Sequence, residues 1–242
     1  MNAEKRSFQL RVIDSLVERL LRSGIDGVGP LRSASSVAAD ARAATATEGE
    51  GERQRAGGRG SEGEGERQRA GGRGSDEDAV DKVIRRHVRL AALEGAVTGL
   101  GGFVTLVVAL PANVWAFHLL AIRMVAAIAA IHGHDVSTAE VRTAVLLALA
   151  GDEARDILHR AGAMARQGRL TSIALRGLPP SALMAVNKGV VFRLLVQFSR
   201  SGLARFGKLV PGMGGVIGGA VDAYLMREIG QRARKDFARA AA

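Results

Sequence analysis

The chain of 242 residues contains no cysteine. This absence excludes a disulfide framework, a thiolate metal site and a cysteine nucleophile. Only five prolines occur, and the apolar/polar alternation typical of strands is nearly absent. Together with abundant alanine and leucine, these features favour an all-helical protein. The first 22 residues carry charge throughout and have no continuous apolar run, so we expect no secretory signal peptide and a cytoplasmic start.

Aromatic residues are also scarce, at 4%, whereas the net charge is high, at +10. Residues 1–80 have a net charge of −1, and residues 81–242 carry +11. A basic surface attracts nucleic acid or anionic lipid headgroups. Nucleic-acid-binding proteins usually add stacking aromatics or a recognisable motif, and this chain has neither. We therefore expect anionic membrane lipid or a membrane protein as the partner, and no nucleic acid.

Two glycine-rich apolar segments, at 95–113 and 208–224, are the most informative feature of the sequence. Both contain small residues four positions apart, which lie on one face of a helix and let a second backbone approach closely. The segments predict a multi-helix bundle with tightly packed helices, inserted in lipid or buried in a soluble core, and a route to a homo-oligomer. The helix-packing glycines are Gly95, Gly99, Gly214, Gly215, Gly218 and Gly219.

Apolar periodicity and capping signals predict the individual helices. The first is an amphipathic helix at 5–22 that Ser23-Gly24 ends, and a short alanine-rich helix follows within 25–47. Another runs from Ser75 into Gly95, and Pro111 is expected at the first position of the next helix. The remaining helices are predicted at 112–131, 137–150, 152–167, 179–199, 203–210 and 216–240.

Residues 48–75 are a tandem duplication, because the 14 residues Glu48–Ser61 recur without change as Glu62–Ser75. The unit has no apolar side chain larger than alanine, so burial cannot offset its ordering entropy. We interpret it as a disordered linker; an RNA-contacting Arg-Gly tail is the alternative, although glutamate balances the arginine. The predicted organisation is an N-terminal helical part at 1–47, the linker at 48–75, and the main helical domain at 76–242.

Several short segments, in order along the chain, resemble the EcsC family of bacterial proteins. They are Gly24–Gly27, Gly99–Gly102, Leu110–Val114, Ile122–Ala129 with Gly133 and Asp135, Asn187–Arg193, Lys208–Pro211 and Gly214–Asp222. The resemblance covers most of 80–240 and also 25–40, so the duplication looks like an insertion within the family domain. It implies an all-helical, membrane-associated protein. The family takes its name from a gene beside an ABC transporter, and it has no established activity to carry over to this chain. The family usually has aromatic residues around Gly133, where this chain has histidines.

His132, His134 and Asp135 are the candidates for a metal site, because three ligands within four residues can converge in a loop. The alternative, which we favour, is a turn in which imidazoles replace packing aromatics, since no second cluster supplies further ligands. We expect no cofactor. A hydrolase-type enzyme with a site around these three residues remains the catalytic alternative.

Charged and amide side chains within apolar helical stretches form a second candidate set. They are Arg123, Asp222, Arg193, Asn187 and Asn113. Buried charges need a partner, so Arg123 and Asp222 are predicted to have one, plausibly each other. In a membrane-facing protein such residues are functional candidates, and an internal salt bridge is the structural alternative. No nucleophile, base and acid come together in the sequence, which argues against an enzyme.

Residues 95–122 carry no acidic or basic side chain except His118, and this run exceeds the roughly 20 residues of a spanning helix. Pro111 interrupts it, however, so peripheral attachment is favoured over a true span. Arg85, Arg86 and Arg89 on one side and Arg123 on the other are expected at membrane interfaces. The sequence thus predicts a protein with a structural or accessory role on the cytoplasmic face of the cell membrane, and a link to a transporter is one form that this role can take. The alternative is a soluble helical interaction protein of the cytoplasm.

Overall fold

The computed structural model describes the chain in several stretches, and in them all regular elements are helices. The described residues are 15, 17–29, 31–55, 64–100, 102–151 and 214–238. The prediction of an all-α fold is confirmed for this part of the chain. The helices predicted at 152–167, 179–199 and 203–210 lie outside the described residues.

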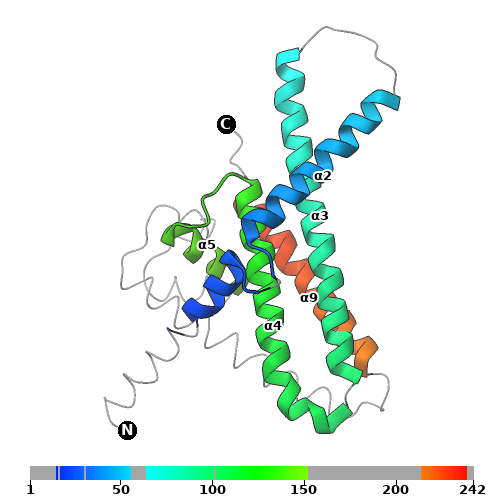
Figure 1. Cartoon of the computed structure of the whole chain (residues 1–242), viewed down its shortest axis with the longest axis vertical. Coiled ribbons are helices and arrows are strands. Elements are labelled where there is room, and N and C mark those ends of the chain that lie inside the picture. The colour runs from blue at the N-terminus through cyan, green and yellow to red at the C-terminus, as the bar shows by residue number, and fades with distance from the viewer. Residues whose placement is uncertain are drawn as a thin grey trace.

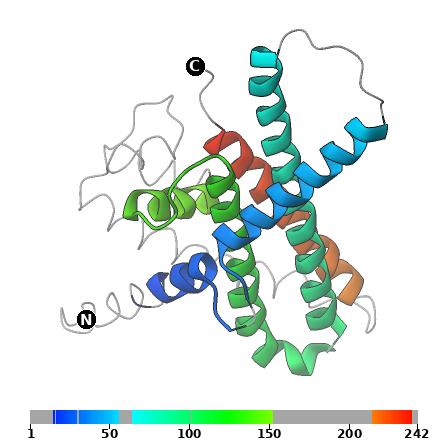
Figure 2. The ribbon, with the colours of Figure 1, turned by 45° about the horizontal axis from the view of Figure 1, so that its top comes forward.

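Six helices follow one another along these stretches (Figure 1). A short N-terminal helix covers residues 17–26. The others are α2 Ala34–Arg55, α3 Glu64–Leu100, α4 Gly102–Ile131, α5 Ala139–Ala150 and α9 Gly214–Phe237. Figure 1 shows α3 and α4 meeting at one end of the molecule. Helix α9 lies beside α3, and α2 crosses α3 and α4. Turning the molecule confirms that α2 crosses α3 and α4 away from the end where they join (Figure 2).

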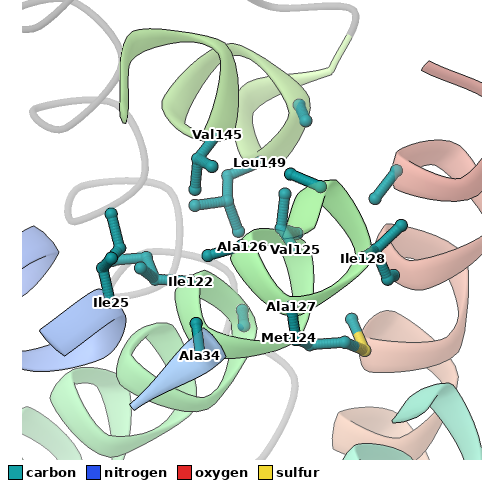
Figure 3. Close-up of a cluster of buried hydrophobic side chains, with 14 of the residues drawn as sticks. Ile25, Ala34, Ile122, Met124, Val125, Ala126, Ala127, Ile128, Val145 and Leu149 are labelled. Atoms are coloured by element: carbon teal, nitrogen blue, oxygen red, sulfur yellow. The ribbon is translucent and has the colours of Figure 1, made fainter. Parts of the chain in front are cut away.

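Helix α4 lies at the centre of the hydrophobic core. Every residue from Ala121 to Ala129 is buried, which is expected of a helix surrounded by other elements on all sides. Figure 3 shows Ile25 lying beside Ile122 on one flank, with Val145 and Leu149 of α5 packed above Ala126. The N-terminal segment, α2, α3, α4, α5 and α9 all contribute to this one cluster.

Helix α5 begins and ends where the sequence predicts. Thr138 caps its N-terminus, and the Thr138 hydroxyl accepts a hydrogen bond from the Val141 backbone N–H. Gly151 ends the helix with φ +54°, and its N–H donates to the Leu147 carbonyl. The predicted helix at 137–150 therefore agrees closely with the structure.

The boundary between α3 and α4 differs from the prediction. α3 continues through Gly95 to Leu100, and α4 starts at Gly102, so Pro111 lies inside α4 rather than at the first position of a helix. A proline inside a helix removes one backbone hydrogen bond and bends the axis. In Figure 1, α4 bends sharply near its N-terminal end.

The end of the N-terminal helix is also displaced. Ser23-Gly24 does not stop it: the helix continues to Asp26 and ends at Gly27, whose φ is +85°. Gly24 serves packing instead, because a Cβ on it would lie 2.5 Å from Cγ2 of Ile122. The glycine that ends a helix and the glycine that allows close contact are indistinguishable in sequence when they stand three positions apart.

The duplicated segment is helical wherever the structure describes it. Helix α2 extends over 48–55 and α3 already begins at Glu64, so the prediction of a disordered linker across 48–75 is wrong for these residues. Glutamate, arginine, glutamine and alanine are strong helix formers, and a helix that extends from a packed turn needs no new nucleation. Residues 56–63 lie outside the described residues, and the division of the chain into domains stays a prediction.

Candidate functional site

Glycines bring α3 and α9 into backbone contact. A Cβ on Gly95 would lie 2.7 Å from the carbonyl oxygen of Gly218 and would also collide with the carboxylate of Asp222. A Cβ on Gly219 would lie 2.6 Å from the carbonyl oxygen of Ala92. No side chain fits between the helices here, so the small residues set how closely they approach. Gly99 lies in α3 and Gly214 and Gly215 in α9, with Gly215 buried.

Further along, the same two helices define an antiparallel register. Ile84 of α3 packs against Gly230 of α9, where a Cβ would lie 3.0 Å from Cγ1 of Ile84. One turn later, Arg234 donates to Glu77 at 2.5 Å and to Asp81 at 2.8 Å. With Gly95 opposite Gly218, this register also determines which surface residues of α3 and α9 lie at the same level along the two helix axes.

A pair of carboxyl groups lies beside the glycine contact. Asp222 is buried, with 5% of its surface exposed, and Glu94 of α3 is half-buried. Burial, reinforced by the charge of Asp222, raises the pKa of Glu94 to about 7. The sequence analysis identified Asp222 but missed Glu94, because Glu94 stands in a charged part of the sequence and only the helix packing brings it to Asp222.

Arg123 of α4 is buried, with 5% of its surface exposed. Its Nε and Nη2 atoms have no hydrogen-bond partner in the described structure. Burial and the neighbouring charge of Arg86 both lower its pKa. Among the described residues, no ion pair joins Arg123 to Asp222, so the predicted partnership is not observed there.

His87 of α3 lies in the same region and is fully buried. Its Nδ1 lies 2.8 Å from the Val83 carbonyl oxygen. Because a carbonyl oxygen can only accept a hydrogen bond, we assign the proton of the neutral imidazole to Nδ1. Burial lowers the pKa of His87 to about 4, and the charges of Arg123 and Arg86 act in the same direction. The imidazole is therefore neutral near pH 7 and adds no further positive charge beside Arg123 and Arg86.

The three candidate metal ligands at 132–135 have separate environments. His134 packs edge-on against Phe237 of α9, with 5.5 Å between ring centroids. Asp135 is exposed and accepts hydrogen bonds from the Ser137 N–H at 2.9 Å and hydroxyl at 2.7 Å, which lower its pKa. His132 is buried. Within the described stretches, no three His, Asp or Glu side chains are grouped to hold a metal ion.

One face of α3 carries a run of cations. Lys82, Arg85, Arg86 and Arg89 stand at the three- and four-residue spacings that share a helix face, and with Leu90 they line a groove of about 360 Å³. The three arginines are exposed. Lys82 pairs with Glu48 of α2 at 2.7 Å, whereas the described residues supply no ion pair to the arginines.

Exposed apolar side chains continue from this basic face toward the end of the bundle. On α3, Leu93 is 64% and Val97 71% exposed. On α9, Val216 is 77% and Tyr224 67% exposed. The register places Val97 level with Val216, and Arg89 level with Tyr224. Figure 2 shows the C-terminal end of α3, the N-terminal end of α4 and the N-terminal end of α9 at the same end of the molecule.

Other candidates of the sequence analysis are not placed in this site. Arg193 and Asn187 lie outside the described residues, and Asn113 lies in α4 within a stretch whose side chains are not described. Among the described residues, none of the helices combines the length and the apolar character that a membrane crossing requires. The candidate site is therefore the end of the bundle where exposed apolar side chains adjoin the basic face of α3.

Comparison with known proteins identifies the family. No curated protein and no solved structure matches the chain. The EcsC protein family matches residues 75–239, which is more than half of the chain and includes α4, α5, α9 and the packed part of α3. The match begins after Gly24–Gly27, so the expectation that the first 47 residues belong to the same family domain stays a prediction. The chain belongs to the EcsC protein family.

Proposed function

We propose that this EcsC family protein docks on an anionic membrane surface through one end of its helical bundle. The docking end consists of the C-terminal part of α3 and the N-terminal parts of α4 and α9. A single observation carries the proposal: exposed Leu93, Val97 and Val216 at this end adjoin the exposed arginines of α3. Apolar residues beside basic ones are the composition of a surface that binds the interfacial region of a bilayer.

The levels of these residues match the layers of a membrane interface. Eight residues separate Arg89 from Val97, which corresponds to about 12 Å along a helix. Interfacial helices bury their apolar side chains about 5–10 Å into the boundary of headgroups and acyl chains. With Val97 and Val216 at that depth, Arg89 and Tyr224 lie at headgroup level, where basic side chains and tyrosine are favoured.

The sequence of the join between α3 and α4 has the same character. Residues 98–110 contain no acidic or basic side chain, and α3 ends and α4 begins within them. Because α3 leads into this end of the bundle and α4 leads away from it, the proposed orientation brings the segment to the bilayer and back without crossing it. Attachment of this kind suits a structural or accessory role at the cytoplasmic face of the cell membrane, beside a membrane protein such as a transporter.

Vesicle flotation tests the proposal. The full chain is mixed with vesicles of phosphatidylcholine containing phosphatidylglycerol, and the wild type is expected to float with them. Val97→Gln combined with Val216→Gln is expected to weaken binding about 30-fold, because each valine contributes roughly 1 kcal/mol when partly inserted. Val28→Gln is the control, since Val28 is 55% exposed in the turn after the N-terminal helix.

The comparison between the two variants decides the outcome. Both keep the fold, because the substituted side chains are exposed, and melting curves verify this. If the double variant binds vesicles as well as the Val28 variant does, the docking end is placed wrongly. If the wild type ignores anionic vesicles altogether, the membrane proposal is wrong.

A further inference from the structure

The groove on α3 has features beyond those of a general basic surface. Its four cations line a shallow space of about 360 Å³ that is open to solvent, and Leu90 adds an apolar side chain to the lining. Among the described residues, only Lys82 of the four has an acidic partner, Glu48 of α2. Three guanidinium groups therefore face this space without a counter-charge from the described part of the protein.

Arg123 adds to the positive potential behind the groove. It lies close enough to Arg86 for that charge to lower its pKa, and its Nε and Nη2 are buried without a hydrogen-bond partner in the described structure. Neighbouring guanidinium groups repel one another, and an anion bound beside them removes that penalty. Within the described residues, the buried Arg123 and the exposed arginines of α3 thus form a cluster of positive charge without an acidic partner.

We propose that this groove binds the phosphate group of a phospholipid headgroup. The inference rests on the proposed membrane docking and specifies what the basic face recognises there. Arginine suits the ligand because its planar fork of N–H donors matches the oxygens of a phosphate in bidentate pairs. The position suits it as well, since Arg89 lies at headgroup level when the docking end is inserted. Leu90 then lies beside the glycerol end of the lipid.

Charge and surroundings favour a lipid over a nucleic acid. Lys82 to Arg89 spans seven residues, or about 10 Å of helix, which matches one or two phosphates rather than a strand. The described residues that line the groove include no aromatic side chain, and exposed Leu93 and Val97 follow on the same helix, whereas single-stranded nucleic acid is bound by basic grooves with aromatic platforms.

The test separates recognition of phosphate from attraction to any negative charge. Two sets of phosphatidylcholine vesicles are prepared at the same surface charge, one with phosphatidylglycerol and one with oleate, whose headgroup is a carboxylate. Wild-type protein is expected to bind the phosphatidylglycerol vesicles about tenfold more tightly, because bidentate charge-assisted hydrogen bonds strengthen the phosphate contact. The preference is the measured quantity, rather than the absolute affinity.

The site variant is Arg85→Gln, Arg86→Gln and Arg89→Gln, and its control is Arg19→Gln, Arg227→Gln and Lys235→Gln. Both remove three exposed positive charges, and the control residues have no ion pair within the described structure. The site variant is expected to bind both vesicle types within twofold of each other. The control variant is expected to bind both more weakly and to keep the tenfold preference.

Each other outcome has a defined meaning. Wild-type binding that is equal on the two vesicle types, or a preference that survives in the site variant, overturns the phosphate site and leaves membrane docking intact. Absence of any vesicle binding overturns docking and the site together. If millimolar inorganic phosphate displaces the wild type from vesicles, the ligand is a soluble phosphate rather than a lipid. RNA binding that exceeds vesicle binding and is lost in the site variant also overturns the assignment.

Discussion

The substitution Gly95→Ala tests the central contact of the fold, the backbone approach of α3 and α9. The new Cβ would lie 2.7 Å from the oxygen and 2.8 Å from the carbon of the Gly218 carbonyl, and it would collide with the Asp222 carboxylate. Separations under 3.0 Å against backbone cannot be relieved by a side-chain rotation. The two helices must therefore move apart, and the contacts along their shared length loosen.

The size of the effect follows from two opposing terms. Alanine gains about 1 kcal/mol over glycine in helix propensity. Forcing an extra carbon into a packed interface costs about 1–3 kcal/mol and more where backbone is in the way. We expect a net loss of about 2 kcal/mol in the free energy of unfolding, which corresponds to a melting temperature lower by about 4–8 °C. The free energy of unfolding is measured by urea denaturation, with far-ultraviolet circular dichroism as the signal.

The matched control is Gly74→Ala on the same helix. A Cβ on Gly74 would meet no atom within 4 Å, so only the propensity term acts, and stability is expected to stay constant or to rise by up to about 1 kcal/mol. Opposite signs for the two substitutions support the close contact. If Gly95→Ala is as harmless as Gly74→Ala, α3 and α9 do not meet at Gly95 and the register is wrong.

Three further predictions concern charges and a turn. The pKa of Glu94, raised to about 7, means that the folded state holds an extra proton between about pH 4.5 and 7, so stability falls as the pH rises through that window. Glu94→Gln should abolish this fall and gain about 1–2 kcal/mol at pH 8 in urea unfolding, a value discounted because Glu94 is only half-buried; an unchanged pH profile contradicts it. Arg123→Met should leave the free energy of unfolding unchanged or raise it by about 1 kcal/mol, because it removes two buried nitrogens that have no hydrogen-bond partner in the described structure. A loss above about 3 kcal/mol in the same assay would show that Arg123 is paired. Gly27→Ala should lower the free energy of unfolding by about 1–2 kcal/mol, since φ of Gly27 is +85° and a Cβ would collide with the Leu31 carbonyl. An unchanged melting temperature would mean that the turn has another conformation.

The sequence predicted those features that depend on local chemistry. Thr138 and Gly151 bound α5 through capping groups that lie within a few residues of the helix, so pattern reasoning found both ends. The small-residue spacing at Gly95 and in 214–219 similarly indicated faces for close contact, because glycine's lack of a side chain is a property of the residue itself. Neither feature requires knowledge of which helix lies opposite.

Features that depend on partners could not be predicted in this way. Pro111 indicates a helix start in isolation, yet α4 runs as one helix from Gly102 to Ile131 across it. Arg123 and Asp222 both stand out as charges in apolar stretches. Only the arrangement of α3, α4 and α9 brings Arg86 close to Arg123 and Glu94 close to Asp222. The sequence indicated the basic and apolar residues of the proposed docking end, but it could not show that Val97 of α3 and Val216 of α9, more than 100 positions apart, lie at the same level.

The most direct test of the account is the depth at which the docking end enters a bilayer. The chain contains one tryptophan, Trp115, which packs against the core, so Trp115→Phe provides a silent background for a single fluorescent probe. In this background, Val216→Trp should be quenched by phospholipids brominated on their acyl chains when the protein is bound to phosphatidylglycerol vesicles, whereas Val28→Trp should not. Equal quenching at the two positions, or none at Val216 in vesicle-bound protein, would contradict insertion of this end of the bundle.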